Sequence, residues 1–205
     1  MTLPGILLIG AGGHARACID VIEAQGRFEV CGLVGQAHEV GMDILGYRVL
    51  GSDADLPALL AQCAHALVTV GQIASPDLRM RIAAQLAGMN VHLPAIVSPR
   101  AHVSRHAVVG AGTIVLHGAV VNAGARVGAH CILNSQCLVE HDAWIDDFCH
   151  VSTGAIVNGA AVVGQGSFVG SGSVLKQGIV LGQRCIVGMG LSVRRDLADR
   201  TTFSG

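Results

Sequence analysis

A histidine between two carboxylates, in Val139-Glu140-His141-Asp142, is the segment best suited to chemistry. An imidazole titrates near neutral pH, and a carboxylate can orient it and stabilise its cation, so His141 is a candidate general base. Adjacent residues on a strand point to opposite faces, so Asp142 pairs with His141 only if the chain bends there. Glu140 is a second candidate partner. The alternative is a solvated surface histidine.

A glycine-rich turn near the N-terminus is a candidate phosphate site. Gly10-Ala11-Gly12-Gly13-His14-Ala15 follows the apolar run Ile6–Ile9 and satisfies G-x-G-x-x-[GA]. Such a turn lets a phosphate approach the N-terminus of a helix closely. A dinucleotide site normally has an acidic residue about 20 positions further on, at the end of the second strand. Here that segment, residues 32–36, contains no acidic residue. The pattern therefore disfavours NAD and favours a mononucleotide or a sugar-nucleotide diphosphate, with a packing turn as the alternative.

His141 lies inside a repeat of six residues. From Val97 to Val193 every sixth residue is Val, Ile or Leu, and a small residue stands four places after most of them. A period of six predicts short strands joined by tight bends, with the aliphatic side chain pointing inward and the small residue filling a narrow interior. Stacked coils then bury one continuous core. Four cysteines stand at the small-residue positions of the repeat and are expected to be buried rather than catalytic: Cys131, Cys137, Cys149 and Cys185.

The first half of the chain alternates strands and helices, which predicts a small parallel α/β unit. We expect strands over 6–9, 30–34 and 67–70, and helices over 16–24, 56–63 and 77–87. Pro94 and Pro99 flank the start of the repeat and indicate a break in regular structure there. We therefore predict two domains, residues 1–94 and residues 95–205.

The composition excludes several classes of protein. Lys and Arg number 13 against 14 Asp and Glu, so no basic surplus points to nucleic acid. Charged residues are only 13% of the chain, which favours an oligomer with buried faces. No apolar run approaches a membrane span and no signal peptide is evident, so we expect a cytoplasmic protein without membrane insertion. Seven cysteines, an odd number with no CxxC pair, argue against a disulfide framework.

The Gly-x-Gly-Gly-His turn, the α/β domain and the hexad repeat with Glu140-His141-Asp142 together resemble the PglD/NeuD family of sugar acetyltransferases, which are hexapeptide-repeat acyltransferases. The resemblance covers essentially the whole chain. It implies a left-handed parallel β-helix, a nucleotide-sugar-binding N-terminal domain, and a homotrimer with active sites between subunits. It also implies acetyl-CoA as co-substrate, no required metal, and N-acetylation of a UDP- or GDP-linked 4-amino-6-deoxy sugar. O-acetylation of sialic acid or a related sugar, and a non-catalytic assembly module, are the alternatives.

The same resemblance implies roles for individual residues. His141 becomes the general base and Asp142 the carboxylate that raises its basicity. Positions that match coenzyme contacts are His150, Gly159, Ser171 and Met189. Positions on the substrate side are Gly12, Gly13, His14 and Gly51. Asn134, seven residues before His141, is a separate candidate for orienting the substrate, with a buried asparagine ladder as the alternative. Gly35 and Gln36 take substrate-side positions at which members that use UDP-sugars often carry acidic residues, so this chain departs there and the nucleobase stays open.

Overall fold

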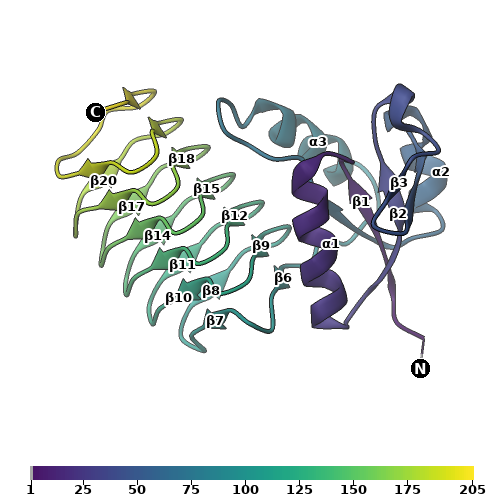
Figure 1. Cartoon of the computed structure of the whole chain (residues 1–205), viewed down its shortest axis with the longest axis horizontal. Coiled ribbons are helices and arrows are strands. Elements are labelled where there is room, and N and C mark those ends of the chain that lie inside the picture. The colour runs from purple at the N-terminus through teal and green to yellow at the C-terminus, as the bar shows by residue number, and fades with distance from the viewer. Residues whose placement is uncertain (1) are drawn as a thin grey trace.

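The computed structural model describes residues 2–205, which form an α/β unit followed by a triangular β-helix (Figure 1). Among these residues no helix is long and apolar enough to cross a membrane. The α/β unit contains strands β1 (Gly5–Ile9), β2 (Glu29–Val34), β3 (Asp43–Ile44), β4 (Tyr47–Gly51) and β5 (His65–Val68), and helices α1 (Gly13–Gln25), α2 (Leu56–Leu60) and α3 (Asp77–Ala87). Two short 3₁₀ turns, η1 (Ala37–Glu39) and η2 (Asp53–Asp55), follow β2 and β4.

The α/β unit has three layers around a sheet of order β3-β4-β2-β1-β5. Strands β4, β2, β1 and β5 are parallel, and β3 pairs antiparallel with β4. Helix α1 packs on one face of the sheet, and α2 and α3 pack on the other. The expected strands and helices are present, but β5 lies two residues before the expected 67–70, α2 ends at Leu60, and the β3–β4 hairpin was missed. The carboxyl ends of β1, β2, β4 and β5 therefore open at one edge, where ligands bind in such sheets.

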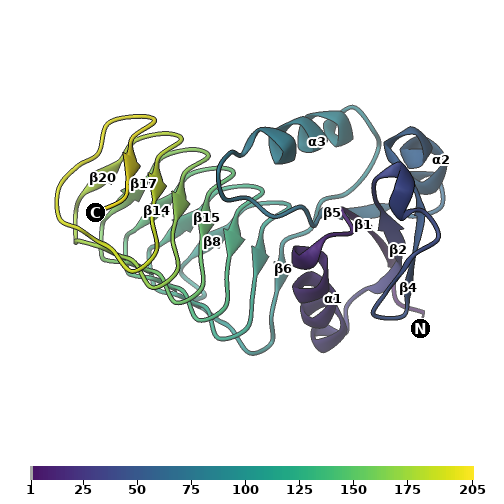
Figure 2. The ribbon, with the colours of Figure 1, turned by 45° about the horizontal axis from the view of Figure 1, so that its top comes forward.

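The repeat folds into two-residue strands that stack into three faces, which Figure 2 shows as a triangular prism. The first face contains β6 (Ile96–Val97), β9 (Ile114–Val115), β12 (Ile132–Leu133), β15 (His150–Val151), β18 (Phe168–Val169), β21 (Ile186–Val187) and β23 (Thr202–Phe203). The second contains β7 (His102–Val103), β10 (Val120–Val121), β13 (Leu138–Val139), β16 (Ile156–Val157), β19 (Val174–Leu175) and β22 (Ser192–Val193). The third contains β8 (Val108–Val109), β11 (Arg126–Val127), β14 (Trp144–Ile145), β17 (Val162–Val163) and β20 (Val180–Leu181).

Each coil uses three hexads, so a residue pairs with the residues eighteen positions away. Val121 pairs with Val103 on one side and with Val139 on the other. The second residue of each strand points inward, and from Val115 onward these aliphatic side chains are almost fully buried. The four cysteines expected in the core are at most 1% exposed there, which confirms them as packing residues.

The α/β unit is fixed on the first face of the β-helix. Outward-pointing Ile96, Ile114 and Ile132 of that face join the hydrophobic core under α1. Three side chains of the α/β unit donate hydrogen bonds to carbonyls of the β-helix: Gln25 to Val97 (3.0 Å), Gln72 to Phe148 (2.7 Å) and Arg79 to His130 (2.8 Å). Two side-chain pairs also cross the seam, Asp77 with Arg184 (2.7 Å) and Asp20 with His117 (2.7 Å). Within residues 2–205, none of these contacts reaches the corner between the second and third faces.

Candidate active site

The His141–Asp142 pair lies on the corner between the second and third faces, immediately after β13. Asp142 has a φ of 59°, in the left-handed region, so the chain bends sharply at this residue. The bend brings Oδ2 of Asp142 to 2.9 Å from Nδ1 of His141. The condition set by the sequence, a bend that lets adjacent residues pair, is therefore met.

The pair leaves Nε2 of His141 free to act as a base. Nδ1–H donates to Asp142, so the neutral imidazole presents the lone pair of Nε2. The hydrogen bond to Asp142, together with the charges of Asp142 and Glu140, raises the pKa of His141. Glu140 itself accepts hydrogen bonds from Asn122 Nδ2 (2.9 Å) and from the backbone N–H of His141 (3.2 Å). The imidazole is 60% exposed in the single chain and therefore open to a substrate.

Two glycines on neighbouring coils make room for this pair. A Cβ added at Gly159, one coil after His141, would lie 2.7 Å from Nε2 of the imidazole. A Cβ at Gly124, one coil before Asp142, would meet the Asp142 carboxylate. Since real Cβ atoms do not approach this closely, any larger residue at either position would displace a member of the pair. Gly159, expected as a coenzyme contact, thus has a structural role beside His141.

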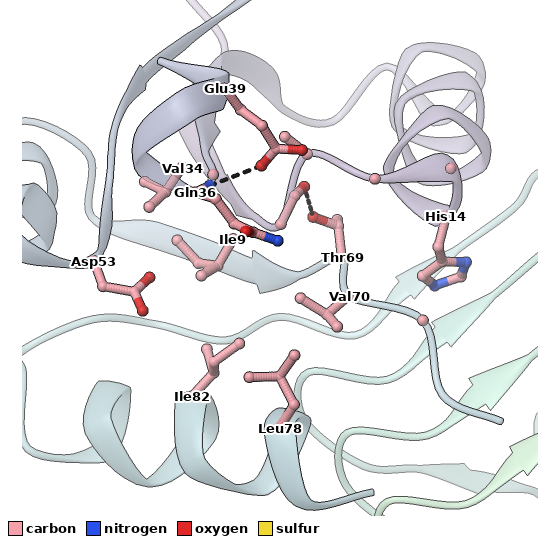
Figure 3. A pocket seen from close by; sticks show the side chains of 16 residues that line it. Ile9, His14, Val34, Gln36, Glu39, Asp53, Thr69, Val70, Leu78 and Ile82 are labelled. Carbon is pink, nitrogen blue, oxygen red and sulfur yellow. Dashed lines mark hydrogen bonds between the residues drawn. The ribbon is translucent and has the colours of Figure 1, made fainter. Parts of the chain in front are cut away.

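A cavity of about 400 Å³ opens at the carboxyl edge of the α/β sheet (Figure 3). Its lining includes five of the predicted substrate-side positions: Gly12, Gly13, His14, Gly35 and Gln36. Gly10 has a φ of 123°, and a Cβ there would lie 2.7 Å from Val70, so this turn requires glycine. The predicted glycine-rich turn therefore does border a ligand-sized space.

One end of the cavity, at the start of α1, has the features that suit an anion. Gly12 caps this helix without a side-chain hydrogen bond, and no acidic residue stands in the first turn, so its N–H groups and positive dipole end are available. His14 lies beside them, and burial and the nearby charge of Arg79 lower its pKa to about 3. Its imidazole is therefore neutral, and its buried Nε2 has no hydrogen-bond partner within residues 2–205. A phosphate or sugar oxygen would supply one.

Comparisons with known proteins agree with this geometry. Residues 5–86 match the family profile of the PglD N-terminal domain, and residues 161–195 match the hexapeptide repeat of succinyl-transferase. A histidine-to-asparagine variant of perosamine N-acetyltransferase from Caulobacter crescentus, in complex with CoA and GDP-perosamine, is 31% identical. The similarity covers 97% of this chain and 92% of that one, with a TM-score of 0.90. The chain belongs to the PglD family of acetyltransferases.

Other solved structures extend the similarity of this PglD-family chain. The acetyltransferase domain of PglB from Neisseria gonorrhoeae FA1090, in complex with acetyl coenzyme A, is 29% identical with a TM-score of 0.89, covering 97% of this chain and 94% of that one. WeeI from Acinetobacter baumannii AYE shares the fold at 21% identity, with a TM-score of 0.84 and coverage of 96% and 94%. No curated protein matches the chain. The predicted fold, an α/β domain followed by a left-handed parallel β-helix, is confirmed.

The remaining predicted residues of this PglD-family acetyltransferase lie apart from His141. Asn134, Ser171 and Met189 lie along the corner between the first and second faces, and Met189 is 81% exposed. Gly51 is buried in β4 beside the Asp55 carboxylate and does not line the cavity. Of the predicted coenzyme contacts, the single chain therefore brings only Gly159 beside the predicted base, and it leaves Ser171 and Met189 on another corner.

His150 occupies the seam between the two parts of the chain. Its side chain is 7% exposed, its Nδ1 lies 2.6 Å from the Gln72 carbonyl, and Asn134 Nδ2 lies 3.2 Å from its Nε2. Burial lowers its pKa to about 4, so the ring is neutral, donates from Nδ1 and accepts at Nε2. Its role as a coenzyme contact stays a prediction, and in the single chain it ties the loop after β5 to the β-helix.

Sequence reasoning missed three charged residues near the cavity. Glu39 and Asp53 line it, brought there by η1 and η2 after the ends of β2 and β4. Arg79 is 1% exposed and donates to the carbonyls of Val68, Val70 and His130. A signal was present only for Asp53, which stands two residues after the predicted substrate contact Gly51.

Proposed function

We propose that the chain transfers the acetyl group of acetyl-CoA to the amino group of a nucleotide-linked 4-amino-6-deoxy sugar. The amine attacks the thioester carbonyl carbon and a C–N bond forms. Nε2 of His141 takes the proton that the amine loses, and Asp142 stabilises the resulting imidazolium. The C–S bond then breaks, and the imidazolium returns the proton to the coenzyme A sulfur as the thiol leaves.

The observation that carries this proposal is the pairing of His141 with Asp142 at 2.9 Å, which leaves an exposed Nε2 of raised pKa. The cavity at Gly12 and Gly13 supports a diphosphate-bearing acceptor, since free N–H groups at a helix start favour anions. The solved relatives agree, because one holds CoA with GDP-perosamine and another holds acetyl coenzyme A. We extend this chemistry to the present chain and leave the nucleobase open here.

We further propose a homotrimer in which one subunit's cavity meets another subunit's His141. The α/β unit packs on the first face, whereas His141 stands on the corner between the second and third faces. The third face presents outward apolar side chains, with Val108 63%, Trp144 51% and Val180 46% exposed. Such a face favours burial against another copy. Joining the two half-sites in trans would also place Ser171 and Met189 beside the coenzyme.

Thiol release from acetyl-CoA, measured over a panel of acceptors, tests the proposal. The panel contains UDP- and GDP-linked 4-amino-6-deoxy sugars, free sialic acid and no acceptor. We expect turnover with a nucleotide amino sugar and a loss of about 10²–10⁴-fold in His141→Ala. The exposed His38→Ala variant is the matched control and keeps its activity. Turnover with sialic acid alone would favour O-acetylation, and no thiol release with any acceptor would favour a non-catalytic role.

A further inference from the structure

The cavity contains a carboxylate that the proposed chemistry does not use. Asp53 lines the cavity at the start of η2, and within residues 2–205 no group donates a hydrogen bond to its side chain. Its neighbour Asp55, by contrast, is engaged in the turn, because it accepts hydrogen bonds from the backbone N–H (2.9 Å) and hydroxyl (3.2 Å) of Ser52. Asp53 is therefore free to receive donors from a ligand.

Asp53 lies at the opposite end of the cavity from the anion-binding turn. In Figure 3, His14 marks one end, and Asp53 lies at the other beside Ile82 of α3. Between the two ends, Ile9 and Val34 line the sheet side, and Leu78 and Ile82 line the helix side. Leu78 is 45% exposed although apolar. These four apolar side chains thus give the middle of the cavity two apolar walls suited to the flat face of a nucleobase, with the polar side chain of Gln36 between the two ends.

Glu39 lies between these ends, where its carboxylate is placed to accept hydrogen bonds from a ribose. Its Oε2 accepts the backbone N–H of Gln36 at 2.7 Å, which holds the carboxylate beside Gly35 and Ala11. A carboxylate after the second strand binds ribose hydroxyls in related α/β folds. With the diphosphate on the turn and the ribose at Glu39, the base extends toward Asp53.

We propose that Asp53 selects guanine by accepting two hydrogen bonds from its N1–H and 2-amino groups. Guanine alone among the common bases presents two adjacent N–H donors on one edge, which match the two oxygens of a carboxylate. Uracil presents a single N–H between two carbonyls, and those carbonyls would face the carboxylate unfavourably. Adenine offers only its 6-amino donor there, next to an acceptor nitrogen. The acceptor is then a guanosine diphosphate sugar, a specification that rests on the proposed function.

Calorimetric binding of plain nucleotides to the full-length protein tests this assignment without any acetyl transfer. We expect GDP to bind more tightly than UDP and ADP, and IDP, which lacks the 2-amino group, to bind at least about 10-fold more weakly than GDP. Asp53→Asn should lose at least about 10-fold in affinity for GDP. The same variant should gain affinity for XDP, because the new amide donates to the xanthine 2-carbonyl.

The matched control is Glu29→Gln, an exposed carboxylate outside the cavity, which should keep the wild-type order of nucleotides. The gain of XDP binding shows that Asp53→Asn is folded. Tighter binding of UDP or ADP than of GDP by the wild type would overturn the assignment, as would unchanged GDP affinity in Asp53→Asn. Neither result depends on acetyl transfer, which the thiol-release assay measures separately. A protein that prefers GDP but does not transfer acetyl groups would overturn only the proposed function.

Discussion

Nδ1 of His141 lies 2.9 Å from Oδ2 of Asp142, its immediate neighbour in the chain. The pair forms because Asp142 adopts a left-handed conformation at a corner of the β-helix, which turns two consecutive side chains to the same side. Glycines on the adjacent coils leave the space that both side chains occupy. The proposed base and its orienting carboxylate therefore come from one turn, and their geometry depends on the stacking of three coils.

Replacing Asp142 by Asn should change the pH dependence of acetyl transfer. Asp142 raises the pKa of His141, so the neutral, basic form predominates only above that raised pKa. The acidic limb of kcat/KM should therefore move to lower pH in Asp142→Asn, and the plateau rate should fall because the imidazolium loses its counter-charge. Profiles of kcat/KM from pH 5 to 9 measure both effects. An acidic limb that stays in place would assign it to another group.

Replacing Gly159 by Ala should displace the base without unfolding the chain. The added methyl group would lie 2.7 Å from Nε2 of His141, so the imidazole must move. We expect kcat to fall at least about 10-fold, because small misplacements of a catalytic group are costly. Gly88→Ala, whose methyl group would make an ordinary 3.6 Å contact, is the control. Equal activities of the two variants would show that His141 need not stay where it lies.

Mixing two inactive variants should restore activity if the site forms between subunits. His141→Ala removes the base, and Gly13→Asp places a negative charge on the phosphate turn, where a side chain has space. In a mixed trimer, the intact cavity of the first variant meets the intact His141 of the second. Co-expression with two different tags, followed by tandem purification and thiol-release assays, measures the recovery. A mixed oligomer with no recovered activity would place the whole site within one chain.

Replacing His150 by Ala should destabilise the seam and reduce its sensitivity to acid. The variant loses hydrogen bonds to the Gln72 carbonyl and to Asn134, at a cost of about 2–4 kcal/mol in the free energy of unfolding. The pKa of His150 is about 4 when folded against an ordinary 6.5, so its contribution is complete above pH 6.5 and is lost as the pH falls toward 4.

Urea unfolding at pH 7.5 and pH 5 measures both effects of the His150 substitution. The wild type should lose more stability between these values than His150→Ala, while His38→Ala, an exposed histidine, should match the wild type. An identical loss in all three proteins would show that His150 is not the acid-sensitive group of the seam.

The six-residue period alone determined the β-helix, because aliphatic residues at every sixth position fit only a chain that turns after each short strand. The glycine-rich turn after Ile6–Ile9 likewise located one end of the cavity. The β3–β4 hairpin was missed because β3 is only two residues long and β4, which contains Arg48 and ends in Gly51, presents no continuous apolar run. Its absence from the prediction also hid Asp53, which the end of β4 carries to the cavity.

The tertiary structure decided what local patterns do not encode. The sequence named His141 and Asp142, but only the left-handed bend at Asp142 and the open space over Gly159 made them a pair. Ile96, Ile114, Ile132 and His150 are the first residues of successive strands on the first face, where the repeat points side chains outward. These outward positions form a buried seam because the α/β unit docks on that face. That docking joins residues more than seventy positions apart, as in the contact of Gln25 with Val97. The physical reason is that burial of one apolar face against another depends on the whole fold, whereas a repeat or a turn depends on its own few residues.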